Sequence, residues 1–178
     1  MPESNTPSNK PSDSSSSSLV VEINDRQSAY TIPEARLCEA GRFVLERAGI
    51  HEGQLSLAVV DNQEMHELNR QFLAHDYPTD VLSFLLSEDG QPFEGEIIIS
   101  AEYAAGESSK YRWRAEDEML LYVIHGTLHL TGMDDHQDED RQAMRDEEAI
   151  VLKHFGLEHR YEGGPEPVAN PPESGEIR

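Results

Sequence analysis

Residues 125–136 carry three histidines at the end of an apolar run, and this pattern predicts a buried helix. On a helix, His125 and His129 lie one turn apart on the same face. Two imidazole nitrogens at this spacing can bind a single ion at about 2.0–2.1 Å. Gly132 is suited to end the helix, and the turn after it would bring back His136 as a third ligand. Three protein ligands with a position left for water are typical of a catalytic metal site.

A core role is the alternative explanation for these histidines. A single histidine in an apolar helix is usually a core residue hydrogen-bonded to a neighbour. Three side by side would need buried partners for all of their ring nitrogens, so the pattern favours a metal site. It is not the peptidase motif His-Glu-x-x-His, because Gly126 occupies the position of the general-base glutamate.

Composition limits the class of protein. The chain has 178 residues, enough for one domain with a substantial core. Its formal net charge of −21 argues against non-specific binding to nucleic acid or to anionic membranes. Cys38 is the only cysteine, which excludes an intramolecular disulfide and a cysteine zinc cluster. With no secretory signal pattern and no apolar run of roughly 18 residues, we expect a cytoplasmic protein without a membrane span.

Both ends of the chain differ in composition from its middle. Residues 1–18 are rich in Ser and Pro, residues 161–178 are rich in Pro, Gly and Glu, and both tails are predicted to be disordered. Residues 19–160 are predicted to form one α+β domain. We expect a small mixed four-stranded sheet packed with about five to six helices, with the metal site at the end of a long helix.

Hydrophobic patterning places these elements. The expected strands are residues 19–23, 55–60, 81–86 and 97–99. The first expected helix follows Pro33, and the second follows Asp61. A third begins near Ser100, a fourth leads into the histidine motif, and the last covers residues 138–154. In the last helix, the residues expected to face the core are Ala143, Met144, Ile150, Val151 and Phe155. The acidic residues expected to form a solvated face are Glu139, Asp140, Glu147 and Glu148.

Three segments together resemble the endoribonuclease YbeY family of bacterial rRNA maturation factors. They are residues 68–84, with the run Pro-Thr-Asp-Val-Leu-Ser-Phe at 78–84, residues 95–100, with Gly-Glu-Ile-Ile-Ile-Ser, and the histidine motif. Their order and separations also fit, so the resemblance covers roughly residues 19–160.

The resemblance implies a single α+β domain with a metal ion held by three histidines in a cleft. It implies cleavage of single-stranded RNA, in 16S rRNA 3′-end maturation and ribosome quality control. The expected ion is one Zn²⁺ per chain, bound by His125, His129 and His136. The expected partners are rRNA and ribosomal particles, with a small-subunit ribosomal protein as a further partner; neither DNA nor a membrane is expected.

The resemblance also suggests residues outside the metal centre. Arg70, His75 and Thr79 are expected to face RNA. Asp80 is expected to orient one of the histidine ligands, as carboxylates near metal sites often do. Glu96 is expected to face the ribosomal partner, the alternative being an ordinary charge on a strand.

The sequence departs from the family pattern at several places, and two of these departures bear directly on the site. The family's third histidine aligns with Asp135, and His136 comes one residue later, so either side chain could supply the third ligand; we favour His136 because the turn can absorb a residue. Leu73 stands where the family commonly has an arginine implicated in cleavage. Arg70 is the candidate to take over the role of that arginine. The alternative is that Arg70 is an ordinary exposed arginine on a helix. No general base is identified, since Asp134 and Asp135 suit a turn equally well.

The sequence therefore predicts a zinc-dependent, single-strand-specific endoribonuclease, with two alternatives. One is a ribosome-assembly factor that keeps the metal for folding and has no nuclease activity, which Leu73 and the net charge favour. The other is a metal-dependent hydrolase of peptides or small molecules, and Gly126 counts against it.

Overall fold

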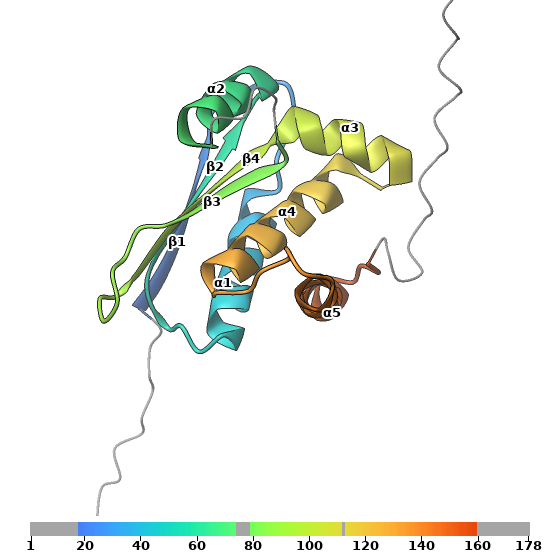
Figure 1. The fold of residues 1–178 in the computed structure, drawn as a ribbon. Coiled ribbons are helices and arrows are strands. Elements are labelled where there is room, and N and C mark those ends of the chain that lie inside the picture. Colours follow the sequence, from blue (N-terminus) through green and yellow to red (C-terminus); the bar gives the residue numbers. More distant parts are fainter. Residues whose placement is uncertain (1–17, 74–78, 112, 160–178) are drawn as a thin grey trace, which may run out of the picture.

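The computed structural model describes residues 18–73, 79–111 and 113–159, which contain a four-stranded sheet and five helices (Figure 1). The strands are β1 (Ser18–Asp25), β2 (Glu52–Val60), β3 (Val81–Leu85) and β4 (Phe93–Ser100). The helices are α1 (Glu34–Arg47), α2 (Asn62–Leu73), α3 (Ala101–Tyr111), α4 (Ala115–Leu130) and α5 (Asp138–His154). The predicted tails lie outside the described residues, apart from Ser18, which begins β1.

The sheet is mixed, with strand order β1-β2-β4-β3. The pairs β1–β2 and β2–β4 are parallel, whereas β3 runs antiparallel to β4. Helix α1 connects β1 to β2, the connection from β2 to β4 contains α2 and β3, and residues 86–92 suffice to connect the antiparallel pair. The predicted α+β class and mixed four-stranded sheet are therefore confirmed.

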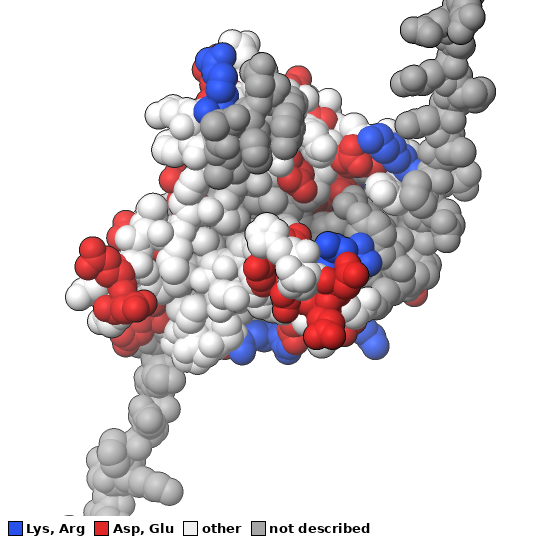
Figure 2. Space-filling view, in the orientation of Figure 1, with Lys and Arg blue, Asp and Glu red and all other residues white. Residues whose placement is uncertain are grey.

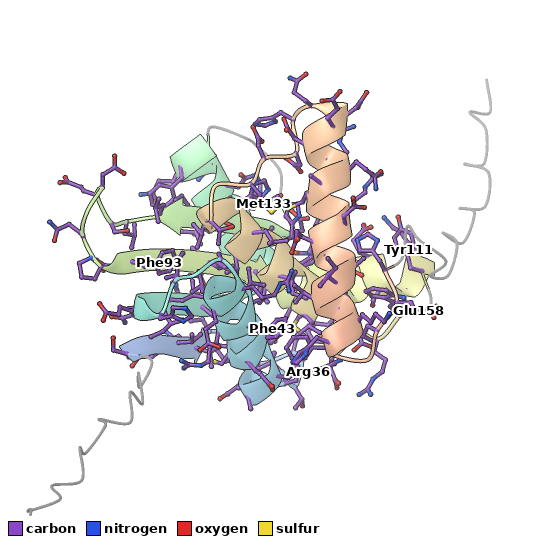
Figure 3. The ribbon with its side chains drawn as sticks, turned by 90° about the horizontal axis from the view of Figure 1, so that it is seen from below. Arg36, Phe43, Phe93, Tyr111, Met133 and Glu158 are labelled. Atoms are coloured by element: carbon purple, nitrogen blue, oxygen red, sulfur yellow. The ribbon has the colours of Figure 1, made fainter. Side chains whose placement is uncertain are left out.

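Side chains alternate between the two faces of the sheet. In β4, Ile97 and Ile99 belong to the main core beneath α1 and α4. Ile98 points the other way, into a smaller core with Met65 of α2. Helix α5 lies across α1 and α4 on the side away from the sheet (Figures 1 and 3). This arrangement leaves the end of α4 between the sheet and α5.

Helix α4 is buried on almost all sides, as its apolar sequence predicts. At Gly126 it approaches the sheet closely. A Cβ atom added there would lie 2.8 Å from Ser83 Oγ, 3.0 Å from Val81 Cγ2 and 3.3 Å from Ile97 Cγ2. The position that holds glutamate in the peptidase motif therefore faces the sheet in this chain.

The prediction for α5 was partly wrong. Its bounds match, and Met144 and Val151 are buried as expected, but Ile150 is 46% exposed and Ala143 is exposed. The buried positions include Glu148. The face of α5 that α1 and α4 cover is therefore rotated about the helix axis from the face that the sequence predicted to be buried. Within the described stretches, no helix is long and apolar enough to span a membrane.

Candidate metal centre

The last two turns of α4 present His125 and His129 on the same face. Their Nε2 atoms lie 3.0 Å apart, and their rings meet at 88°. The helix then ends as predicted at Gly132, whose φ of +95° favours glycine. The Met133 N–H donates to the Leu128 carbonyl and the Gly132 N–H to the His129 carbonyl, which turns the chain back past the histidines.

The hydrogen bonds of the two rings show which nitrogens can bind an ion. His129 Nδ1 lies 3.0 Å from the Met133 carbonyl oxygen, which can only accept, so Nδ1 carries the hydrogen. His125 Nδ1 lies 2.6 Å from Glu148 Oε1, and an ionised carboxylate also only accepts. In the neutral rings both Nε2 atoms therefore have lone pairs, and these face each other. Two lone pairs 3.0 Å apart repel unless a proton or a cation lies between them.

The carboxylate of Asp135 completes a triangle with these two nitrogens. Its Oδ2 lies 3.8 Å from His125 Nε2, and its Oδ1 lies 3.9 Å from His129 Nε2. Donors at about 2.0–2.1 Å from a tetrahedral ion are separated by roughly 3.3 Å, so the three observed edges bracket this value. The residues present therefore fit a divalent metal ion.

His136 lies in a different position from the one expected. Its side chain is 82% exposed, and its Nε2 lies 3.6 Å from Asp134 Oδ1. Asp134 Oδ1 also accepts from the backbone N–H groups of Asp135 and His136, at 2.7 and 3.3 Å. Such an Asx turn fixes the backbone that carries Asp135. The structure thus brings Asp135 to the histidine pair, and His136 as a ligand stays a prediction.

Glu148 was expected on the solvated face of α5, and this prediction is wrong. It is buried on α5, where Oε1 accepts from His125 and Oε2 lies 2.7 Å from Nε2 of the buried His159. Burial alone would raise the pKa of Glu148, but the hydrogen bonds and charges of the two histidines outweigh it and lower the pKa to about 2. Its spacing from Met144 and Val151 was the available signal, because it puts Glu148 on the core side of α5.

The same neighbours act on His125. Burial acts to lower its pKa, but the hydrogen bond with Glu148 and the negative charges of Glu148, Asp80 and Asp135 prevail, so the pKa is raised. The negative charges that favour a proton on His125 also favour a metal cation there, and a metal would bind the deprotonated ring.

A cavity of about 210 Å³ opens beside the metal centre. Its lining residues come from α4, α5, the loop between them and the residue before β3: Asp80, Leu121, Tyr122, His125, Asp135, Arg141, Met144, Arg145 and Glu148. Figure 3 shows the loop at Met133, which connects the end of α4 to α5. The centre is therefore at the wall of a cavity large enough for part of a substrate.

Residues 22–156 of this chain match the model of the family described as Endoribonuclease YbeY. This chain belongs to the endoribonuclease YbeY family. The endoribonuclease YbeY of Rhodopirellula baltica is 41% identical over 112 residues, which cover 62% of this chain and 58% of that protein. The endoribonuclease YbeY of Bacillus licheniformis is 32% identical over 155 residues, covering 79% of this chain and 97% of that protein.

A solved structure supports the fold of this YbeY-family chain. The solution structure of TM1509 from Thermotoga maritima matches with a TM-score of 0.52 and 27% identity, over 77% of this chain and 92% of that chain. The predicted family and fold class are therefore both confirmed.

The other residues expected in a YbeY-type site lie in several places. Asp80 lines the cavity, and its Oδ1 accepts from Thr79 Oγ1 and from the Val81 N–H, each at 2.9 Å. Arg70 is exposed in the last turn of α2 and does not line this cavity. Glu96 has the same strand parity as Ile98, so it lies on the sheet face opposite α4. His75 lies outside the described residues.

Proposed function

We propose that this chain is a metal-dependent endoribonuclease that cleaves single-stranded RNA at the centre formed by His125, His129 and Asp135. The observation that carries the proposal is the pair of Nε2 lone pairs, 3.0 Å apart, facing an Asp135 carboxylate. The endoribonuclease names of the relatives supply the reaction class. A bound ion would supply Lewis acidity toward a phosphoryl oxygen and lower the pKa of a bound water.

We propose zinc as the ion, at one per chain. Two imidazole nitrogens and one carboxylate oxygen form a donor set that zinc accepts in catalytic sites, with a position left open. Asp135 is the proposed third donor because its carboxylate faces the histidine pair. His136 remains the alternative donor, and it would require the Asp134 turn to rearrange.

The protein's own groups would hold the ligands in place. Glu148 fixes the His125 ring, and the Met133 carbonyl fixes the His129 ring, so both Nε2 atoms stay directed at one point. Asp80 lies on the cavity wall, where Thr79 and the start of β3 hold its carboxylate. There it can accept a hydrogen bond from a bound water or from a sugar hydroxyl.

We further propose that the substrate is rRNA in ribosomal particles, in 16S rRNA 3′-end maturation and ribosome quality control in the cytoplasm. The support is the family resemblance together with the net charge of −21, since a strongly acidic chain attracts free RNA poorly. A ribosomal protein that contacts the sheet face carrying Glu96 would compensate for weak RNA attraction. Arg70, His75 and Thr79 are proposed to face the RNA.

The ribosome-assembly factor without nuclease activity is the second candidate. Leu73 cannot bind phosphate, and the acidic surface favours protein partners over free RNA. The peptide hydrolase is disfavoured, because Gly126 packs against β3 and β4 and leaves no room for a general-base side chain.

The decisive experiment compares cleavage of model RNA and of ribosomal particles by metal-loaded protein. Wild type should cleave, and His125→Ala should lose both the metal and the activity. His51→Ala, at an exposed position before β2, is the matched control and should retain both. Metal-loaded wild type that cuts neither substrate would favour the assembly factor, and turnover of a peptide without RNA cleavage would favour the peptide hydrolase.

A further inference from the structure

Two arginines on α5 line the cavity that contains the metal centre. Arg141 and Arg145 are four residues apart, so they lie one turn apart on the same side of the helix. His125 and Asp135 line the same cavity. Figure 2 shows positive side chains beside acidic ones over α5.

The guanidinium of Arg141 makes two hydrogen bonds and keeps further N–H groups that can bind a ligand. Nη1 donates to Asp138 at 2.8 Å, and Nη2 donates to the His136 carbonyl at 3.3 Å. The Asp138 side chain is 96% exposed, so this ion pair contributes little to stability. The guanidinium has further N–H groups, and its planar shape matches a phosphate group. Arg141 can therefore keep the turn after Asp134 in place and still contact an anion.

Arg145 lies nearer in sequence to Glu148 than Arg141 does. It is half-buried and lies three residues before Glu148, whose carboxylate bonds to His125 at 2.6 Å. Helix α5 therefore holds the backbone of Arg145 in a fixed relation to Glu148, which bonds to the proposed ligand His125. A group bound by Arg145 would lie in the cavity beside the metal ion.

The charge of the cavity lining depends on the metal ion. Three carboxylates, those of Asp80, Asp135 and Glu148, and two guanidinium groups give a balance of −1. A bound divalent cation changes this balance to +1. In a chain of net charge −21, the loaded cavity would then be a local positive region within a negative field. Binding of a polyanion at this place should therefore require the ion.

We propose that Arg141 and Arg145 bind phosphate groups of the RNA strand and hold one phosphodiester beside the metal centre. This inference rests on the proposed function and names the residues that would select its substrate. Bidentate contacts from arginine to phosphate are strong and directional, so they fix the strand as well as attract it. Both arginines act on substrate binding and orientation and neither coordinates the ion.

The test measures RNA binding separately from cleavage. Binding of a short, unstructured, fluorescently labelled RNA by the full-length zinc-loaded protein is measured over a series of salt concentrations. Each lost phosphate contact should reduce the slope of log affinity against log salt by about 0.7. Arg145→Gln should show this reduction and weaken binding roughly ten-fold. Arg145→Lys should keep most of the slope, because it keeps the charge.

Arg114→Gln is the matched control. Arg114 precedes α4, its side chain is 73% exposed, and it does not line the cavity. The slope of log affinity against log salt for Arg114→Gln should therefore equal that of the wild type. Metal content and melting temperature, measured for each variant, separate a lost phosphate contact from a damaged centre. Arg141→Gln should lower the slope as Arg145→Gln does, and the double variant should lower it by about twice as much.

The outcomes separate this inference from the proposed function. Unchanged slopes in Arg141→Gln and Arg145→Gln, with wild type cleaving RNA, would overturn the inference and leave the nuclease proposal intact. Reduced slopes with a wild type that binds but never cuts would support the arginine contacts and overturn the nuclease proposal. RNA binding that is unaffected by removing the ion would also contradict the inference, since the cavity would then attract phosphate without its cation.

Discussion

Oε1 of Glu148 lies 2.6 Å from Nδ1 of His125, although 23 residues separate them in the chain. The contact connects α5 to the last turns of α4 directly behind the proposed metal ligands. Because Glu148 also bonds to His159 through its other oxygen, one buried carboxylate orients two imidazoles. The metal centre therefore depends on how α5 packs, as well as on the histidine motif itself.

Glu148→Gln should weaken metal binding about 10- to 100-fold, the usual cost of losing such a supporting hydrogen bond. Glu148 bonds to the two histidines through different oxygens, and a glutamine in its place has an NH2 group at one of these two positions, so one of the bonds is lost. A zinc competition titration with a chromogenic chelator measures the change. Glu147→Gln is the control, because Glu147 is more exposed and bonds to Arg47 at 2.9 Å. Equal affinities in the two variants would contradict the role given to Glu148.

The lowered pKa of Glu148 predicts how the stability of the protein depends on pH. The pKa of Glu148 falls from an ordinary 4.5 to about 2 in the folded protein. A lowered folded pKa means that the ionised group stabilises the fold above about pH 4.5, and that this stabilisation is lost as the pH falls toward about 2. Urea unfolding of the metal-free protein across this range should show a steeper loss for wild type than for Glu148→Gln. If the free energy of unfolding falls equally with pH in wild type and in Glu148→Gln, other carboxylates account for the loss of stability in acid.

The third ligand is tested by two neighbouring substitutions. Asp135→Ala should weaken zinc binding much more than His136→Ala, because Asp135 faces both Nε2 atoms and His136 is mostly exposed. The same chelator titration measures both variants. Neither change should lower the melting temperature of the metal-free protein by much, since both residues lie in a turn. If His136→Ala releases the ion and Asp135→Ala keeps it, the turn rearranges on metal binding and the ligand expected from the sequence is restored.

Local signals explain what could be predicted from the sequence. The spacing of His125 and His129 on an apolar run was enough to place both on one helix face, because helix periodicity does not depend on the rest of the fold. Gly132 could be recognised as a helix end because few other residues adopt its positive φ. The helix expected after Asp61 begins at Asn62, and Asp61 Oδ1 accepts from the Glu64 N–H at 2.8 Å, as an N-terminal cap does.

Tertiary packing explains what could not be predicted. Glu148 belongs to an acidic stretch that is mostly solvated. Its spacing from Met144 and Val151 indicates the core side of α5, but only the packing of α5 on α1 and α4 shows that a carboxylate there is buried. The choice between Asp135 and His136 depends on the course of the backbone after Gly132, which the Asp134 turn sets and composition does not. His159 follows α5 in an acidic and polar context that gave no reason to expect a buried partner for Glu148.

Gly126 offers a test of the packing that brings the histidines to the sheet. Gly126→Ala should reduce the free energy of unfolding by about 1–2 kcal/mol, because the added Cβ would crowd Ser83, Val81 and Ile97 together. Gly106→Ala is the control, since Gly106 is exposed in α3 with nothing within 4 Å of an added Cβ. That change should raise the free energy of unfolding by about 0.5–1 kcal/mol through helix propensity alone. Urea denaturation measures both.

The Gly126 result also bears on function. His125 precedes Gly126, so displacing α4 from the sheet should move the His125 ring relative to Glu148 and lower zinc affinity in Gly126→Ala. Gly106→Ala should leave zinc affinity unchanged. If Gly126→Ala is as stable as Gly106→Ala and binds zinc normally, α4 does not need to lie so close to β3 and β4. A side chain at position 126 would then be permitted, and the packing argument against a peptidase-type centre would fail.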